Sequence, residues 1–423
     1  MTDAWVVLLG GNPLNAGFPD LAKRLGAKLL VVDWSASPAI TGDKTLQIDI
    51  KDSATVSAAL DQLGLKVLFA YTAADVATET VAQINERAGL RRPSAEALDR
   101  ARNKRLMSKA WARAGLLRKN QTVCQRPGDI TAFLESEQGD IIVKPVSSSS
   151  SRGVSVVRRQ DRSRLDLGAI WLRASECDPD QSVLAETFVE GIEYTVEMIG
   201  DDEGNVEVWG VSRKHHTSLN VLNRIAVKLH YNPPEMSRSE LEELATFGAD
   251  CFRALGLKSS LGHFEVIRSA EGTLVPVELA ARSSGYIATH LLDALAADLP
   301  SPWSKGFLPR FVESLSGGVV EEGLLPSERS SMYFFYDPPT GVWSKEGASL
   351  ADQLAPDIEV LAHDRSRLKA GAYMSAVDCD NDRIGFEILA APRTCLTESA
   401  VAVAETALYA EALTRPDAQL SSE

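Results

Sequence analysis

The chain has 423 residues, of which 44% are hydrophobic and 24% are charged, and this balance is typical of a globular protein. Its 58 acidic and 44 basic residues give a net charge of −14, which argues against a nucleic-acid-binding surface because no block of lysine and arginine offsets the acidic excess. The length exceeds one ordinary hydrophobic core, so we expect two or three packed units.

The cysteines and the apolar runs indicate in which cellular compartment we expect the protein. The five cysteines are scattered and form no Cys-x-x-Cys pair, which predicts reduced thiols and neither a zinc nor a redox motif. The opening MTDAWVVLLGG has no basic region ahead of a long apolar stretch, so we expect no signal peptide. No apolar run approaches the ~20 residues of a membrane span, so we expect no membrane partner and a cytoplasmic location.

Residues 1–92 alternate apolar runs with helical patterns. WVVLLGG, KLLVVD and KVLFAY predict buried strands, each followed by a helix, and this alternation is typical of a parallel sheet covered on both faces. Gly10-Gly11 and Asp33 follow the first two strands, faintly like a dinucleotide-binding fingerprint. The spacing does not match G-x-G-x-x-G, so we favour a tight turn and keep an NAD-dependent oxidoreductase as an alternative.

The pattern changes after this unit. Residues 94–115 predict one helix that ends at Gly115. From about residue 120 the strands come as hairpins with acidic turns, at 200–205 and 269–273, which indicates antiparallel α+β structure. A connection rich in proline, serine and glycine follows Pro300 and leads to a last unit with an alanine-rich closing helix.

A run of five serines, 147–151, lies between the apolar segments DIIVKPV and GVSVVRR. A hairpin loop of small hydroxyl residues leaves backbone N–H groups free, and such loops bind anions. Gly153 permits the positive φ that such a loop needs, and Lys144 is costly to place in an apolar strand without a role. We interpret the stretch as a phosphate-binding flap, with a disordered linker as the alternative.

A pair of glutamates marks the hairpin at 262–285. A two-residue turn at Glu271-Gly272 would place Glu265 opposite Glu278, with their Cβ atoms about 4.5–5.5 Å apart. Like charges so placed destabilise a hairpin unless a cation lies between them, and a set of oxygen ligands favours Mg²⁺ over zinc. His263 and Arg282 share this face by strand parity. Two solvated surface glutamates are the alternative interpretation.

A further polar strand face lies in EYTVE, where Glu193 and Glu197 point to the same side. Glu186 precedes the apolar TFV, whose backbone groups suit a flat base. A solvated strand face is the alternative. The chain has neither a P-loop nor a G-x-S-x-G motif. The adjacent His215 and His216 point to opposite faces, and we interpret them as surface residues.

In this order along the chain, these segments resemble the ATP-grasp superfamily, and most of all its L-amino acid (carboxylate–amine) ligase branch. The similarity covers nearly the whole chain and rests on Asn103-Lys104, Lys144-Pro145, the loop closing on Ser151 to Gly153, AETFVEG, EYTVE, H-x-E followed by E-x-x-x-R, and the C-terminal GFEILAAPRTCLTESAVAVAETA. It implies an N-terminal parallel α/β domain (1–93), an ATP-grasp domain with antiparallel sheets (94–310) and a mobile lid (about 120–188), and a C-terminal subdomain (311–423).

The resemblance also implies residue roles. The phosphate side of an ATP site comprises Lys104, Lys144, Ser151 and Gly153. The adenine and ribose side comprises Glu186, Phe188, Val189 and Glu193. Glu265 and Glu278 would bridge Mg²⁺ (or Mn²⁺) ions, and the catalytic residues would be Arg282, which steadies the charge of an acyl phosphate and a tetrahedral intermediate, and Lys144. The substrate side comprises His263, Ser283, Ser284 and Gly285.

The implied activity is an ADP-forming, ATP-dependent ligase that joins a small-molecule carboxylate to an amine and forms amino-acid amides or dipeptides. Two departures stand out: many members carry asparagine where this chain has Ala280, and the flap is rich in serine where glycine is common. We leave a homodimer open. The alternatives are a carboxylase-like or carbamoyl-phosphate-like ATP-grasp enzyme acting on another small acid, and a nucleotide-binding module that has lost catalysis.

Overall fold

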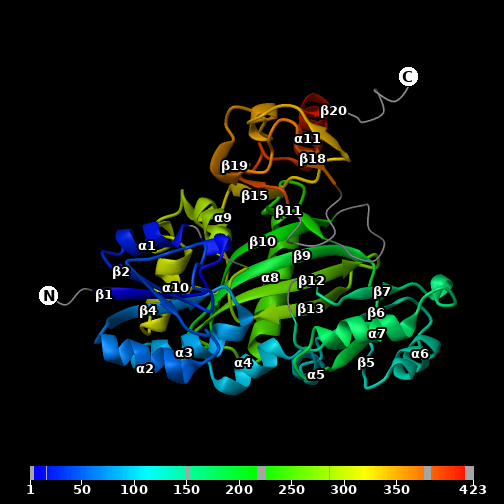
Figure 1. The fold of residues 1–423 in the computed structure, drawn as a ribbon, viewed down its shortest axis with the longest axis horizontal. Coiled ribbons are helices and arrows are strands. Elements are labelled where there is room, and N and C mark those ends of the chain that lie inside the picture. The colour runs from blue at the N-terminus through cyan, green and yellow to red at the C-terminus, as the bar shows by residue number, and fades with distance from the viewer. Residues whose placement is uncertain are drawn as a thin grey trace.

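The computed structural model describes residues 4–15, 17–148, 152–216, 225–284, 286–375 and 383–414. It confirms the predicted mixture of α/β and α+β units, since a parallel sheet stands beside sheets built mainly from antiparallel strands. In Figure 1 the N-terminal unit lies to the left of a large central sheet, a small sheet with two helices lies to the right, and the C-terminal unit lies above. In the described part of the chain no helix is both long and apolar enough to cross a membrane.

The N-terminal unit is the predicted parallel sheet. Its strands are β1 (Ala4–Leu9), β2 (Lys28–Asp33), β3 (Lys44–Gln47) and β4 (Lys66–Thr72), in the order β3-β2-β1-β4. Helices α1 (Phe18–Arg24), α2 (Ser53–Leu63) and α3 (Thr78–Arg87) complete the unit, with short 3₁₀ turns at Pro13–Asn15 and Asp75–Ala77. Strand β3 was not predicted, because KTLQ is short and only partly buried.

The turn after β1 is filled by the chain itself. Asp33 Oδ2 accepts a hydrogen bond from Gly11 N at 2.7 Å, and Ile40 N donates to Gly11 O at 2.9 Å. A Cβ atom at Gly11 would lie 2.7 Å from Ile40 O. The glycine therefore lets residues 38–42 pack closely against the turn. The N–H of Gly11 is bonded to Asp33 and is not free to bind a dinucleotide phosphate. This geometry favours the tight turn over the NAD alternative.

The prediction of one helix over 94–115 is wrong. The structure has two helices, α4 (Ala95–Arg102) and α5 (Lys104–Arg113). Asn103 separates them with φ −103° and ψ 106°, and its side chain accepts hydrogen bonds from Arg105 N and Leu106 N at 3.1 Å each. Asparagine is a favoured N-cap because its oxygen satisfies backbone donors that have no partner within the helix. The break places Lys104 at the start of α5, where its N–H donates to Val146 O.

A separate four-stranded sheet follows, built from β5 (Gln121–Cys124), β6 (Ile141–Pro145), β7 (Ser155–Val157) and β8 (Val183–Thr187) in the order β5-β8-β6-β7. Helices α6 (Pro127–Ser136) and α7 (Leu167–Glu176) share one hydrophobic cluster with it. This range is the one that we expect to act as a lid, and its mobility stays a prediction. We refer below to this sheet and its two helices as the lid sheet.

The large sheet has nine strands. Its main order is β13 (Leu274–Ala280), β12 (Ser260–Ser269), β9 (Gly191–Gly200), β10 (Val206–His216), β11 (Ala226–Tyr231), β15 (Arg329–Phe335), β19 (Phe386–Pro392) and β17 (Glu359–Asp364), with β14 (Gly323–Leu324) beside β10. Four of these strands, β14, β15, β17 and β19, lie beyond residue 310, and α10 (Phe307–Leu315) spans the boundary that we placed there. A small sheet of β16 (Gly341–Trp343), β18 (Tyr373–Met374) and β20 (Leu413–Thr414) completes the C-terminal part.

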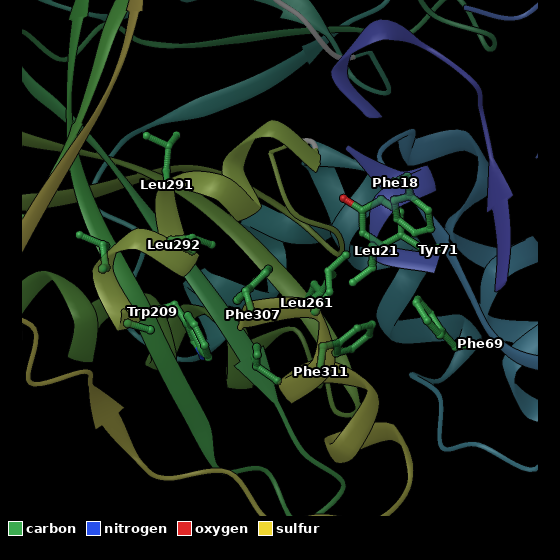
Figure 2. Packing of buried hydrophobic residues seen from close by; sticks show 14 of the residues in the cluster. Phe18, Leu21, Phe69, Tyr71, Trp209, Leu261, Leu291, Leu292, Phe307 and Phe311 are labelled. Atoms are coloured by element: carbon green, nitrogen blue, oxygen red, sulfur yellow. The ribbon is translucent and has the colours of Figure 1, made fainter. Parts of the chain in front are cut away.

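The two faces of the large sheet differ. Helices α8 (Arg238–Ala254) and α11 (Glu398–Ala412) pack on one face, with Phe264 and Met332 among the buried residues. On the other face, α9 (Tyr286–Ala296), α10 and the N-terminal unit enclose a common core. Figure 2 shows this core, which includes Phe18 and Tyr71 of the N-terminal unit, Leu261 of β12 and Phe311 of α10. The core therefore holds the N-terminal unit against the sheet.

We expect Asn103→Ala to lower the free energy of unfolding by about 1 kcal/mol, because the first turn of α5 loses its side-chain cap. Urea unfolding followed by circular dichroism measures this change. Asn103→Ser is the matched control, since serine keeps a capping oxygen and should cost only a few tenths of a kcal/mol. An equal loss in both variants would show that the cap is not what holds the helix break.

Candidate active site

The face of the large sheet that packs on the N-terminal unit becomes polar toward the lid sheet. In β9, Glu193 and Glu197 lie on this face, whereas Tyr194 and Val196 are buried in the core with α8 on the opposite face. The side chains of Glu193 and Glu197 are 17% and 0% exposed, respectively. The alternation predicted from the sequence is present, but the solvated-face alternative is wrong because these carboxylates are largely buried.

Glu265 and Glu278 are direct partners across β12 and β13, as predicted. The two-residue turn on which that prediction rested is wrong. Ser269 N donates to Thr273 O, which leaves a three-residue loop that closes at Gly272 with φ +83°. That loop shifts the register by one residue, and a bulge restores it, because Val266 pairs with Pro276 while the preceding Glu265 pairs with Glu278.

Each of the two opposed carboxylates has a lysine partner. Lys214 of β10 places Nζ 2.6 Å from Glu193 Oε1 and 2.8 Å from Glu265 Oε1. Lys104 of α5 places Nζ 3.1 Å from Glu278 Oε1 and 2.6 Å from the carbonyl of Ser148. Burial opposes the charge on Lys214, but Glu193 and Glu265 outweigh it and raise the pKa of this lysine. The lysines thus supply the positive charge that an opposed glutamate pair requires.

Two histidines complete this polar face. His263 Nδ1 lies 2.7 Å from Glu197 Oε1, which also accepts a hydrogen bond from Tyr231 at 3.1 Å. His216 Nε2 lies 3.0 Å from Glu193 Oε2, so the interpretation of His216 as a surface residue is wrong. Glu197 Oε2 is buried and has no hydrogen-bond partner among the described residues. An unsatisfied buried carboxylate oxygen is costly, and a cation or a donor group of a ligand would satisfy it.

The lid sheet carries a second charged cluster. Glu186 Oε2 lies 2.7 Å from Lys144 Nζ and 2.8 Å from Lys119 Nζ, and all three side chains are at most 6% exposed. Burial opposes the charge on Glu186, but the two lysines outweigh it and lower the pKa of this carboxyl to about 2. Burial lowers the pKa of Lys119 to about 8, and Glu186 offsets this only in part. Glu186 has two lysines, which lower its pKa strongly, whereas Lys119 has only a share of one carboxylate, which does not offset the effect of burial on its pKa.

Lys119 was missed by sequence reasoning. It lies in the segment before β5, next to Arg118, and nothing in its local pattern distinguishes it from a surface lysine. It reaches Glu186 only because Gln121 of β5 pairs with Glu186 of β8 in the antiparallel register. Pairing of strands so distant in the chain has no local sequence signal.

Of the remaining predicted nucleotide residues, Phe188 and Val189 lie in the segment that connects the lid sheet to the large sheet, and Gly153 lies against α7. Phe188 N donates to Asp140 O at 2.9 Å, and the Arg158 guanidinium lies 4.9 Å from the centre of the Phe188 ring. Val189 follows and is partly buried. Gly153 adopts φ +73°, and a Cβ atom there would approach Arg173 O at 3.1 Å. Ser151 lies outside the described residues.

Arg282 connects the end of β13 to the N-terminal unit. Its Nη2 lies 2.7 Å from Asp75 Oδ2, and its Nη1 donates to the carbonyl of Ser283. Burial opposes its charge, but Asp75 first and Glu278 with it raise the pKa of Arg282. Ser283 is buried and its Oγ lies 2.6 Å from Tyr71 Oη, while Ser284 is partly buried. Gly285 lies outside the described residues.

Comparisons with known proteins place part of this fold in a family. Residues 138–290 match the family model of the ATP-grasp domain, so this part of the chain is an ATP-grasp domain, as the resemblance seen in the sequence predicts. The large sheet, the lid sheet and the parallel N-terminal unit together have a fold similar to that of the two solved structures named next.

The L-amino acid ligase of Bacillus licheniformis has a similar structure, with a TM-score of 0.71 and 16% identity over 97% of both chains. The biotin carboxylase domain of Hydrogenobacter thermophilus 2-oxoglutarate carboxylase, solved with MgADP, has a TM-score of 0.68 and 13% identity over 93% of this chain and 87% of that one. In sequence, the D-alanine–D-alanine ligase of Chromohalobacter salexigens is 28% identical over 186 residues, which are 42% of this chain. The chain spans 53% of that relative's length.

The shared carboxylate predicts a specific pH dependence. The folded chain releases the Lys119 proton near pH 8, whereas the unfolded chain holds it up to its ordinary pKa of 10.5. The folded state therefore binds fewer protons in this window, and the stability that depends on Lys119 rises with pH between these values. We expect the free energy of unfolding of the wild type relative to Lys119→Met to rise by an amount on the order of 1–3 kcal/mol from pH 8 to pH 10.5.

Urea unfolding across this pH range measures the difference. Lys109→Met, which removes an exposed lysine of α5, is the control and should show no such trend relative to the wild type. A wild-type advantage that falls as the pH rises would mean that Lys119 is held in the charged form by Glu186.

Proposed function

We propose that the protein is an ADP-forming, ATP-dependent carboxylate–amine ligase that activates a carboxylate as an acyl phosphate and joins it to an amine. The observation that supports this most directly is the opposed pair Glu265 and Glu278, each of which is held by a lysine from another element within an ATP-grasp domain. The lysines balance the charge of the pair, and both glutamate side chains stay partly exposed, at 24% and 29%, so their oxygens can still be reached by a ligand.

The donor set suits the cation that ATP-grasp chemistry requires. Glu265 and Glu278 would hold Mg²⁺ or Mn²⁺, because both ions prefer carboxylate oxygens. Ala280, which stands where many members carry asparagine, offers no ligand atom, but it pairs with His263, and His263 in turn contacts Glu197. Glu197 Oε2, which has no hydrogen-bond partner among the described residues, gives this polar face one more free acceptor. Bound magnesium would neutralise phosphate charge and polarise the terminal phosphate.

The lysines would prepare the site for a triphosphate. Lys104 and Lys144 approach from α5 and β6, and Lys119 joins Lys144 through the shared Glu186. Positive charges that are already in place lower the repulsion between the phosphates and an incoming carboxylate without rearrangement during the reaction. Closure of the lid sheet would keep water from the acyl phosphate. Arg282, held by Asp75, would stabilise the negative charge that develops on the acyl oxygen when the amine attacks.

The comparisons support a proposal for the substrate class. The names of the structural neighbour and of the curated relative both describe ligases that act on amino acids, so we propose an amino acid as the acid and an amino acid as the amine. The small-molecule partners and the cytoplasmic location belong to the same proposal. The similarity to the biotin carboxylase domain keeps a carboxylase-like reaction as the alternative outcome.

Glu278→Gln should reduce turnover by at least about 100-fold, because it removes a charged metal ligand from the site of phosphate transfer. Phosphate release at saturating ATP and Mg²⁺ measures the rate, and a melting curve checks the fold. Glu271→Gln is the matched control, since Glu271 lies exposed at the tip of the same hairpin. Near-normal turnover of Glu278→Gln at ordinary Mg²⁺ would remove the metal role.

The reaction should release ADP and phosphate only when an acid and a nucleophilic amine are both present, because the proposed metal site serves the terminal phosphates. Phosphate release across a matrix of amino-acid pairs, with mass spectrometry of the condensed product, tests this expectation. Release of AMP and pyrophosphate would contradict an acyl-phosphate mechanism. Formation of ADP without an amide for any amine would favour the carboxylase-like alternative.

A further inference from the structure

A second cluster of ligand-type side chains lies on the opposite face of the large sheet, where α8 and α11 pack. It comprises His230 of β11, Glu235 of the segment between β11 and α8, and Glu398, the first residue of α11. One ring nitrogen of the histidine and one oxygen of each carboxylate all lie within 4.8 Å of one another. Arg213 and Lys214 are neighbours in β10, so their side chains point to opposite faces of the sheet. Lys214 faces the candidate active site, whereas Arg213 and its cross-strand partner His230 lie on the other face, so the sheet separates the cluster from that site.

His230 is held in one tautomer by its neighbours. Ser330 Oγ donates to the carbonyl of Tyr231 at 2.9 Å, so the hydroxyl oxygen accepts from His230 Nε2 at 2.9 Å. The proton therefore sits on Nε2, and Nδ1 carries a free lone pair. The side chain is fully buried, and Nδ1 has no hydrogen-bond partner among the described residues. Burial, with nearby positive charge, lowers the pKa of His230 to about 3, so the imidazole stays neutral.

This arrangement is typical of a histidine that binds a metal ion through one ring nitrogen while a hydrogen bond at the other nitrogen fixes the ring. Metal-binding histidines commonly donate the hydrogen of their second ring nitrogen to a fixed oxygen, which orients the ring. Leaving a buried acceptor unsatisfied costs about 1–3 kcal/mol, so the bare Nδ1 calls for a cation or a donor. Neither Glu235 nor Glu398 can supply a proton to it while ionised.

The two carboxylates are held close together in spite of their like charge. Glu235 Oε1 accepts from the backbone N of Glu398 at 2.7 Å, which fixes it at the start of α11. Arg213 Nη1 lies 2.8 Å from both oxygens of Glu398, and His215 Nε2 lies 3.5 Å from Oε1. Burial, with a contribution from Glu235, raises the pKa of Glu398 in spite of Arg213. The Arg213 guanidinium thus pairs with Glu398, and the backbone N–H of Glu398 holds Glu235 beside it, so both carboxylates lie next to the histidine.

We propose that His230, Glu235 and Glu398 form a divalent transition-metal site that takes Zn²⁺ and fixes the start of α11 to the large sheet. A neutral imidazole nitrogen with two carboxylate oxygens is a zinc-type ligand set, whereas Mg²⁺ prefers oxygen ligands alone. Glu235 is exposed, so the site is open to solvent on that side and leaves room for a water ligand. The site adds a structural metal to the proposed enzyme and does not depend on its activity.

The test measures Zn²⁺ binding to the full chain by calorimetry in excess Mg²⁺, which competes for the glutamate pair Glu265 and Glu278. We expect one Zn²⁺ per chain and a rise in melting temperature on binding. Co²⁺ in place of Zn²⁺ should give visible absorption bands of a low-coordinate nitrogen and oxygen site. No zinc binding under these conditions, or binding that Mg²⁺ displaces, would overturn the proposal.

Variants locate the site. Glu235→Gln keeps an acceptor for Glu398 N but removes a charged ligand, and it should weaken Zn²⁺ binding at least ~10-fold and abolish the rise in melting temperature. Glu398→Gln should do the same. Glu405→Gln is the matched control, because Glu405 lies on the same helix and pairs with Lys228 at 2.6 Å outside the cluster. Arg213→Gln should tighten binding, since it removes a positive charge. Zinc affinity unchanged in Glu235→Gln, or lowered equally in Glu405→Gln, would contradict the assignment.

Discussion

Two carboxylates face each other across one strand pair, and the other charges of the candidate active site are arranged around them. The backbone register of β12 and β13 brings Glu265 and Glu278 together, so a change of side-chain rotamer cannot separate their Cα atoms. Lys214 and Lys104 reach them from a neighbouring strand and from a separate helix. A site with this much fixed charge is prepared for an anion with its counter-cation, because little rearrangement is needed when both bind.

The lid sheet repeats the same principle with the opposite balance. There a single carboxylate, Glu186, is shared by Lys119 and Lys144, so the cluster has excess positive charge. The large sheet contributes excess negative charge around Glu193, Glu197 and Glu265. A magnesium-bound triphosphate between the two sheets would place its phosphates against the lysines and its cation against the glutamates, which matches both imbalances.

The packing of the N-terminal and C-terminal units on the large sheet holds the charged groups of the site in place. The hydrophobic core shown in Figure 2 holds the N-terminal unit against the large sheet, and Arg282 with Asp75 adds an ion pair across the same junction. Strands β15, β19 and β17 extend the sheet on its other side and bring α11 across the face that is remote from the active site. The proposed zinc site at His230, Glu235 and Glu398 would tie that helix to the sheet.

Local pattern was enough to predict the parallel N-terminal sheet, the alternation of Glu193 and Glu197 in β9, and the facing of Glu265 and Glu278, since each depends on residues close together in the chain. Even there a bulge compensated for a loop one residue longer than predicted. Tertiary structure alone decided that Lys119 meets Glu186, that Lys214 bridges Glu193 and Glu265, and that His230 meets Glu398. The physical reason is that side-chain direction repeats with a local period along a strand, whereas a contact between distant segments depends on strand order and register, which are set by the packing of the whole chain.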